Sequence, residues 1–244
     1  MKSVNKISRL LCGAVALLLL FSSAYSFNAS AATRPWIGFS EKDNVFCSGC
    51  TEERLIALTF DDGPHPKYTD EILDILNEYD VKATFFVIGE NAARYPEKLK
   101  RIASEGHEIG NHTYSHRHLS ELSRAEFLSE LSRADTEIFT HTGIHPVLFR
   151  PPEGCCTKIT VENAVSLGYK IILWTIDPRD WASPPVSEVT GNVLKHAHAG
   201  AILLCHDYNC GKRNPTPEAL RQFIPRLREM GYEFVTVSEL LSIK

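Results

Sequence analysis

The chain has 244 residues and a formal net charge of −4 at pH 7, and 43% of its residues are hydrophobic. This length allows one large α/β domain or two small ones. No run rich in Lys and Arg occurs beyond the first residues, so the composition argues against binding to nucleic acid or anionic lipid through a basic patch. A neutral or positively charged substrate fits this charge better.

The N-terminal segment has the organisation of a secretion signal. Three cations precede an apolar stretch over residues 10–21, and Ala29-Ser30-Ala31 supplies the small residues of a cleavage site. The apolar stretch is short for a membrane span. We therefore predict a signal peptide over 1–31, a secreted or cell-wall-associated protein, and no stable membrane anchor after cleavage. Loss of the three cations takes the net charge from −4 to about −7.

The rest of the chain divides into an arm and one domain. Residues 32–53 carry Pro, Gly, Ser and Asp without a clear period, and we interpret them as a linker or N-terminal arm. From residue 54 to residue 244, short apolar runs alternate with stripes at helical spacing, which predicts an α/β domain with a mainly parallel sheet. The pattern does not distinguish an open sheet from a closed barrel. The predicted strands cover 55–60, 83–88, 107–111, 147–150, 170–176, 201–206 and 233–237, and the predicted helices cover 72–79, 96–106, 123–143, 158–168, 186–198 and 217–231.

Six cysteines remain after the signal segment, and they occur in local pairs. In an exported protein an even number favours disulfides over reduced thiols, and favours both over a structural zinc site. The spacing leaves the pairing open. The pairs are Cys47 and Cys50, Cys155 and Cys156, and Cys205 and Cys210.

Polar residues interrupt the apolar framework where predicted strands end. Asp61 and Asp62 close the first strand, where Gly63-Pro64 turns the chain, and two adjacent carboxylates repel unless they share a cation or a proton. His112 and His116 follow the third strand, four residues apart, so both can face one metal ion. Alone, the first motif could be a helix cap and the second an incidental pair. Together they provide two His and one carboxylate, the ligand set of a catalytic metal site with open positions.

Three later strands place further groups at the same edge. Arg150 ends the predicted strand 147–150, and the two prolines that follow hold it extended. Asp177 follows the predicted strand 170–176, and His206 ends the predicted strand 201–206. Taken singly, Arg150 and Asp177 could form a surface ion pair, and His206 could be a capping or core residue. The carboxyl ends of parallel strands meet at one edge, so the set predicts a single polar site there.

These strand ends carry five ordered motifs, which are Thr59-Phe60-Asp61-Asp62-Gly63-Pro64, His112-x-x-x-His116, Arg150-Pro151-Pro152-x-Gly154, Asp177-x-x-Asp180-Trp181 and Leu204-x-His206-Asp207. In order and spacing they resemble the motifs of the polysaccharide deacetylases, the NodB-homology group also called carbohydrate esterase family 4. The resemblance spans 54–244. It implies a distorted (β/α) barrel with fewer than eight units and a metal-dependent removal of N-acetyl groups from a glycan.

The resemblance also implies a role for each motif residue. Glu153 departs from the family, which usually has an aromatic residue there, and its carboxylate would add negative charge near the site. The metal would be one divalent ion, with zinc as the default and cobalt, nickel, manganese or iron as alternatives. The implied roles are general base for Asp61, metal ligands for Asp62, His112 and His116, orientation of Asp61 by Arg150 and of Arg150 by Asp177, general acid for His206, and a substrate pocket of Pro152, Glu153, Trp181 and Leu204.

We therefore expect a hydrolase acting on a polysaccharide that contains N-acetylglucosamine. Bacterial peptidoglycan is favoured over chitin or chito-oligosaccharides because the signal segment looks bacterial. Removal of O-acetyl groups from xylan is a second alternative that would use the same groups. A non-catalytic glycan-binding protein is disfavoured because every matched catalytic and ligand position is intact. The expected partner is the glycan alone, and the expected state is a monomer.

Overall fold

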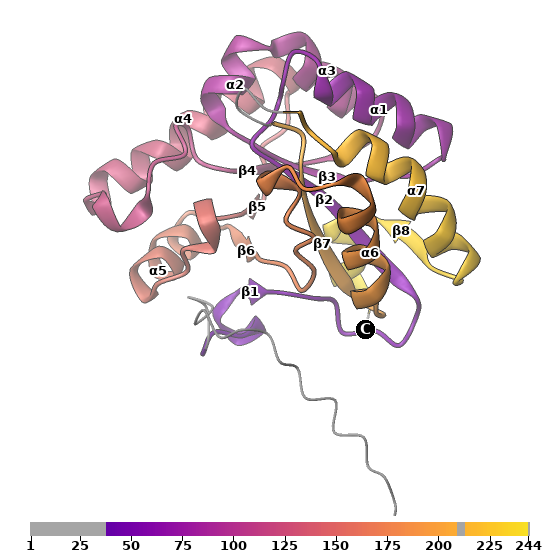
Figure 1. The fold of residues 1–244 in the computed structure, drawn as a ribbon. Coiled ribbons are helices and arrows are strands. Elements are labelled where there is room, and N and C mark those ends of the chain that lie inside the picture. The colour runs from indigo at the N-terminus through magenta and orange to yellow at the C-terminus, as the bar shows by residue number, and fades with distance from the viewer. Residues whose placement is uncertain (1–37, 209–212, 244) are drawn as a thin grey trace, which may run out of the picture. The chain divides into compact units, whose positions relative to one another are not determined.

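A parallel sheet runs through the computed structural model, which describes residues 38–208 and 213–243 (Figure 1). The strands follow one another in the order β1-β6-β5-β4-β3-β2-β7, and β8 pairs with β2 beside this path. Every pair of strands is parallel, as the alternating sequence pattern predicts. The strands are β1 (Val45–Phe46), β2 (Leu55–Asp61), β3 (Thr84–Val87), β4 (Glu108–Asn111), β5 (Leu148–Phe149), β6 (Lys170–Ile172), β7 (Ala201–His206) and β8 (Glu233–Val235).

The sheet curves into the distorted barrel that the family resemblance implies. The segment after β6 reaches β7, where Ile176 forms a parallel bridge with Leu203. Because β7 is one end of the strand order and β6 stands next to the other end, this bridge brings the two sides of the sheet together. The seven predicted strands are confirmed, and β1 is an addition that the sequence pattern does not reveal.

Helices cover the outside of the sheet. Each helix in the series α6, α7, α1, α3, α4 and α5 contacts the next (Figure 1). The six predicted helices are confirmed, and α2 and α8 are too short to show a helical stripe. None of the described helices has the length and apolar character needed to cross a membrane. The helices are α1 (Tyr68–Glu78), α2 (Gly89–Arg94), α3 (Pro96–Ser104), α4 (Arg124–Thr142), α5 (Lys158–Ser166), α6 (Val186–His196), α7 (Thr216–Glu229) and α8 (Val237–Ser242).

The two faces of β2 have different surroundings, because successive side chains of a strand point to opposite faces. Ile56, Leu58 and Phe60 are buried against the covering helices. Ala57 belongs to a separate cluster inside the barrel. Thr59 and Asp61 lie two and four residues after Ala57, so their side chains point to the same inner face. The strand therefore places a carboxylate at the end of the barrel interior.

The described part of the N-terminal arm is built into the domain. β1 pairs with β6, and Gly49 N donates a hydrogen bond of 2.8 Å to Gly200 O. The predicted signal peptide lies outside the described residues. No disulfide joins the cysteines that the structure describes, and Cys210 lies outside them, so the disulfides stay a prediction.

The contact between the arm and the barrel can be tested at Gly200. Its φ is 74°, and a Cβ there would collide with the backbone oxygen of Gly49. Gly168 has a comparable φ of 85°, but a Cβ there would meet nothing within 4 Å. We expect Gly168→Ala to lower the free energy of unfolding by about 1 kcal/mol, and Gly200→Ala to lower it by a further 1–3 kcal/mol, roughly. Urea unfolding measures both, and equal losses would contradict a tight arm contact.

Candidate active site

A cavity of about 470 Å³ opens at the carboxyl ends of the strands. The structure brings together in it nearly all of the side chains that the sequence predicts. Trp174 joins them without having been predicted, whereas Pro152 is buried behind the rim and Arg150 beneath the floor. The lining consists of Asp61, Asp62, His112, His116, Glu153, Trp174, Asp177, Trp181, Leu204 and His206.

Arg150 and Asp61 form a buried ion pair under this cavity. Arg150 Nη1 lies 2.7 Å from Asp61 Oδ1, and the same nitrogen donates to Thr59 Oγ1 at 2.7 Å. Arg150 is fully buried and Asp61 is 4% exposed. Charge-assisted hydrogen bonds of this kind fix geometry strongly, so the guanidinium holds this carboxylate in one orientation. Asp61 therefore has the surroundings of a proton acceptor.

The expectation that Asp177 holds Arg150 is wrong. Backbone carbonyls hold the guanidinium instead, because Nε donates to Ile172 O and Nη2 donates to Leu173 O, each at 3.2 Å. Asp177 Oδ1 accepts a hydrogen bond from the backbone N–H of Arg179 at 2.8 Å. Asp177 is thus an exposed carboxylate of the cavity wall.

Asp180 is a functional residue that the sequence reasoning left without a role. It is 1% exposed, and its Oδ1 lies 2.8 Å from His206 Nδ1. Its Oδ2 accepts hydrogen bonds from His206 N and Thr216 Oγ1. The motif from Asp177 to Trp181 contains both acids, but nothing in the spacing indicates which one faces His206.

The contact with Asp180 decides the protonation of His206. Burial would lower the pKa of this imidazole, but the nearby Asp180 carboxylate and its hydrogen bond outweigh burial and raise the pKa to about 10. The imidazolium is therefore the form present at neutral pH. With Nδ1 engaged by Asp180, Nε2 is the nitrogen left to serve the cavity.

Asp62, His112 and His116 form a group that could hold a metal ion. Their ligand atoms lie within 4.8 Å of one another, and Asp62 Oδ1 is 3.3 Å from the Nε2 atom of each histidine. This buried oxygen has no hydrogen-bond partner among the described residues. Burial opposes ionisation of Asp62, but three nearby histidines, His112 foremost and then His206 and His116, hold its pKa below the usual range. Two imidazoles around one otherwise unpartnered carboxylate oxygen fit a divalent cation.

Hydrogen bonds from neighbouring groups orient these candidate ligands. His112 Nδ1 lies 2.7 Å from Arg150 O, which leaves Nε2 for a metal. The loop that carries His116 is held by Glu130 of α4, whose carboxylate accepts hydrogen bonds from Tyr114 N and Ser115 N. Glu130 is a positioning residue that the sequence does not reveal, because it lies mid-helix and far from the motifs.

Backbone conformations around the cavity are unusual. Asp62, His116 and Glu153 have φ values of 76°, 53° and 55°, in the left-handed region that costs a non-glycine residue about 1–3 kcal/mol. The turn at Glu153 leaves its backbone N–H without an acceptor among the described residues, although the next two N–H groups donate to Pro151 O and Pro152 O. The turn therefore offers one N–H donor at the cavity rim.

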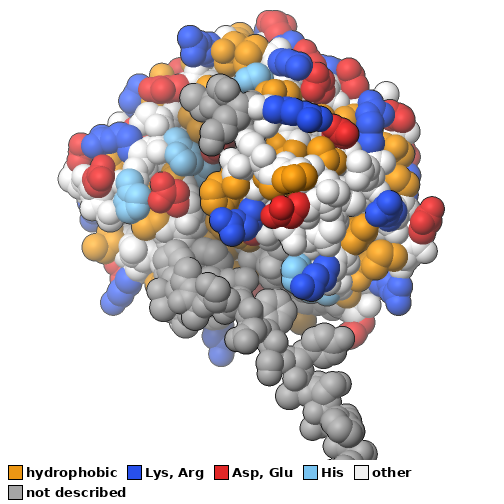
Figure 2. Space-filling view, viewed as in Figure 1, with side chains coloured by type: hydrophobic (Ala, Val, Ile, Leu, Met, Phe, Trp, Pro, Cys, Tyr) orange, Lys and Arg blue, Asp and Glu red, His pale blue; other side chains and the backbone are white. Residues whose placement is uncertain are grey.

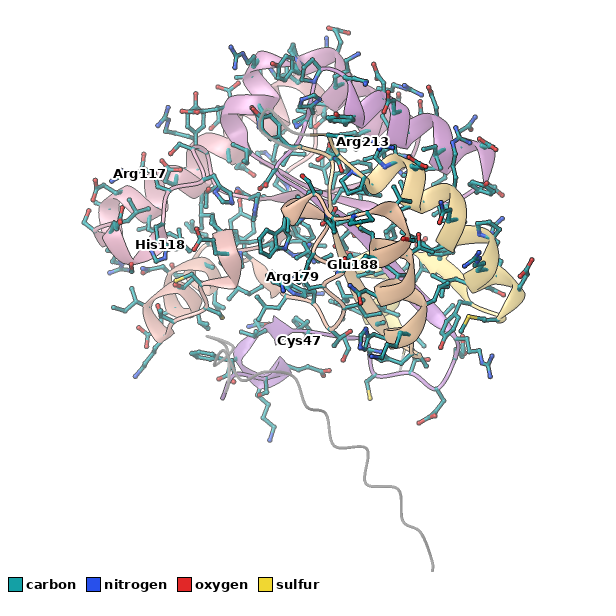
Figure 3. The ribbon with its side chains drawn as sticks, in the orientation of Figure 1. Cys47, Arg117, His118, Arg179, Glu188 and Arg213 are labelled. Atoms are coloured by element: carbon teal, nitrogen blue, oxygen red, sulfur yellow. The ribbon has the colours of Figure 1, made fainter. Side chains whose placement is uncertain are left out.

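The rim itself carries side chains of both charges. His118 Nε2 lies 3.5 Å from Glu153 Oε2, and the Arg179 guanidinium lies 5.3 Å from the ring centre of Trp181. Figure 3 labels His118 and Arg179 at these places. On the face shown in Figure 2, Lys and Arg are interspersed with Asp and Glu.

Comparisons with known proteins agree with this geometry. Residues 48–172 match the sequence model of the family described as polysaccharide deacetylase. A peptidoglycan-N-acetylglucosamine deacetylase of Bacillus cereus is 43% identical over 195 residues, which cover 79% of this chain and 90% of the relative. A chitooligosaccharide deacetylase of Bradyrhizobium sp. is 38% identical over 198 residues, which cover 77% of this chain and 90% of the relative.

Solved structures give the same result. The crystal structure of a peptidoglycan N-acetylglucosamine deacetylase superimposes with a TM-score of 0.80 at 36% sequence identity, covering 84% of this chain and 95% of that chain. Fold, motifs and sequence similarity thus coincide along the described domain, and the chain belongs to the polysaccharide deacetylase family.

Proposed function

We propose that this protein is a metal-dependent hydrolase that removes N-acetyl groups from the N-acetylglucosamine units of bacterial peptidoglycan. One observation carries the proposal: a carboxylate held by Arg150, an imidazolium held by Asp180 and a three-ligand cluster all face one cavity. These are a base, an acid and a candidate metal site, which together can catalyse the hydrolysis of an amide.

The metal site in this proposal consists of Asp62, His112 and His116. These side chains would hold one divalent ion, which would supply Lewis-acid polarisation of the acetyl carbonyl and a lowered pKa for water. Two imidazoles and a carboxylate suit zinc first, and cobalt, nickel, manganese or iron as alternatives.

The protein's own groups supply the proton transfers. Asp61 accepts the proton of the attacking water, since its hydrogen bond with Arg150 orients the carboxylate. The backbone N–H of Glu153 donates a hydrogen bond to the oxyanion that forms on the acetyl carbon. His206 gives its proton to the departing amine, which would otherwise be a poor leaving group. Leu204 and Trp181 line the cavity and would enclose the acetyl methyl.

Peptidoglycan is the preferred substrate because the Bacillus cereus relative and the superimposed structure both carry that substrate in their names. The Bradyrhizobium relative makes chito-oligosaccharides the second candidate. Secretion through the predicted signal peptide, disulfide formation after export and a monomeric state are parts of the same proposal. Acetate release from peptidoglycan, chito-oligosaccharides and acetylated xylan, assayed side by side, would rank the substrates.

Replacement of the base tests the mechanism. We expect Asp61→Asn to lower kcat by roughly 10²–10⁴-fold, because the amide cannot accept the proton of water. Asp177→Asn should cost less than about tenfold, since Asp177 makes no contact with Arg150. Acetate release measures both, and circular dichroism checks folding. Equal losses in the two variants would restore a role for Asp177 in holding Arg150, and an active Asp61→Asn variant would refute the base assignment.

Removal of a metal ligand tests the metal site. We expect His112→Ala and the more exposed His116→Ala to weaken binding of a divalent ion by about 100-fold or more, with a parallel loss of turnover. His118→Ala is the matched control, because this rim histidine is not in the ligand cluster and should retain the metal. Elemental analysis after dialysis measures occupancy. Full turnover in the presence of a strong chelator would contradict the assignment.

The pairing of His206 with Asp180 predicts a pH effect. The active acid is the imidazolium, which the raised pKa of about 10 preserves up to alkaline pH. Asp180→Asn removes the anion, so the pKa of His206 falls and the proton is lost as pH rises through the lower value. We expect the alkaline limb of kcat/KM to move down by about 1–3 pH units. The loss of kcat/KM in Asp180→Asn relative to the native protein should therefore grow from pH 5 to pH 9. An unmoved limb would exclude His206 as the acid.

A further inference from the structure

A second cavity lies close to the active site, and none of its residues takes part in the proposed chemistry. Its volume is about 260 Å³. The short turn Leu119–Glu121, the first residues of α4 and the first half of α5 surround it. The turn follows directly after the loop that carries His116, so the chain itself connects the cavity to the metal site.

Side-chain contacts also connect the two cavities. Glu153 lines the active site, and its Oε2 lies 3.5 Å from His118 Nε2. The other ring nitrogen, Nδ1, lies 2.7 Å from Ser120 Oγ, and Ser120 lines the second cavity. One imidazole ring thus bridges a wall of each cavity, at the position that Figure 3 labels His118. A ligand branch that crosses this ridge would enter the second cavity.

The apolar part of the second cavity suits alkyl groups better than a sugar ring. Leu119, Leu122 and Ile159 supply aliphatic walls, and Ile159 is 67% exposed. Phe127 is the aromatic residue of the lining, but it is 4% exposed and offers little ring face for stacking. In the active site, by contrast, Trp181 is 46% exposed. The two cavities therefore favour different parts of a substrate.

The polar part suits a carbonyl and a carboxylate. The exposed Arg124 forms no ion pair with another described residue, and a guanidinium is the preferred partner of a carboxylate. Asn163 is 4% exposed, and its Nδ2 is the one buried side-chain nitrogen without a hydrogen-bond partner among the described residues. A buried donor without an acceptor is unfavourable, and a ligand carbonyl would satisfy it.

We propose that the second cavity binds the peptide branch of the glycan, that is, an acylated short peptide with small alkyl side chains and a free carboxylate. This inference rests on the proposed function, because peptidoglycan carries such peptides on the sugars that alternate with N-acetylglucosamine. The acetylated sugar occupies the active site while the branch of its neighbour crosses the ridge of Glu153, His118 and Ser120. The alkyl groups then contact Ile159, and the carboxylate pairs with Arg124.

Two substrates with the same glycan test this arrangement. One substrate is peptidoglycan strands that carry their peptides. The other is the same strands after an amidase has removed the peptides. We expect kcat/KM for acetate release to be about tenfold higher with the peptides present. Arg124→Gln and Ile159→Asp should each remove about 3- to 10-fold of that advantage and leave the rate on stripped strands unchanged. The matched control is Lys158→Gln, an exposed neighbour outside the cavity lining.

Equal rates of the native protein on both substrates would overturn the proposal, and so would variants that lose activity equally on both. A binding measurement separates this result from a failure of the proposed function. Titration of the isotope-labelled protein with N-acetyl-alanyl-glutamate should shift the backbone amide NMR signals of Leu119, Ile159 and Asn163. The same titration of the Arg124→Gln variant should leave these signals unshifted. Shifts elsewhere, or none at millimolar peptide, would contradict the inference even if the protein deacetylates both glycans.

Discussion

The site depends on one buried guanidinium. Arg150 lies at the end of the barrel interior, where its side chain bonds to Asp61 and Thr59 of β2 and to the carbonyls of Ile172 and Leu173 at the end of β6. Its own carbonyl oxygen contacts His112 Nδ1. A charge removed from water is tolerated only when such partners surround it. The same contacts fix the proposed base and a candidate metal ligand relative to one another. The hydrogen-bond partners that the buried guanidinium needs therefore position both the base and the metal site.

Around this cation, similar carboxylates acquire different roles from their surroundings. Asp61 faces Arg150, Asp62 faces two imidazoles, and Asp180 faces His206. Asp177 instead accepts a hydrogen bond from the backbone N–H of Arg179 at the exposed cavity wall. Neighbouring acids in different environments can take different roles, and one site can then carry out acid and base chemistry together. The positive φ values of Asp62 and His116 belong to the same arrangement, because they turn both ligands toward one point.

Much of this could be predicted from sequence because it depends on local pattern. The apolar run before Asp61 predicts a buried strand, and the Ser123–Glu126 capping box predicts the start of α4, where both of its hydrogen bonds are present. The motif residues mark the carboxyl ends of the strands. Glu130 and Asn163 were not predicted, because a polar residue within a helix gives no sign of whether it is buried against a loop or a cavity.

The sequence by itself therefore determined the α/β class, the order of the strands along the chain and the residue types gathered at one edge of the sheet, because these follow from hydrophobic periodicity and motif spacing. Tertiary structure decided which partners meet. Asp177 and Asp180 lie three residues apart in one loop, and only the folded path of that loop turns Asp180 toward His206 and leaves Arg150 to backbone carbonyls. Contacts between groups so distant along the chain depend on how the barrel closes, which no local pattern encodes.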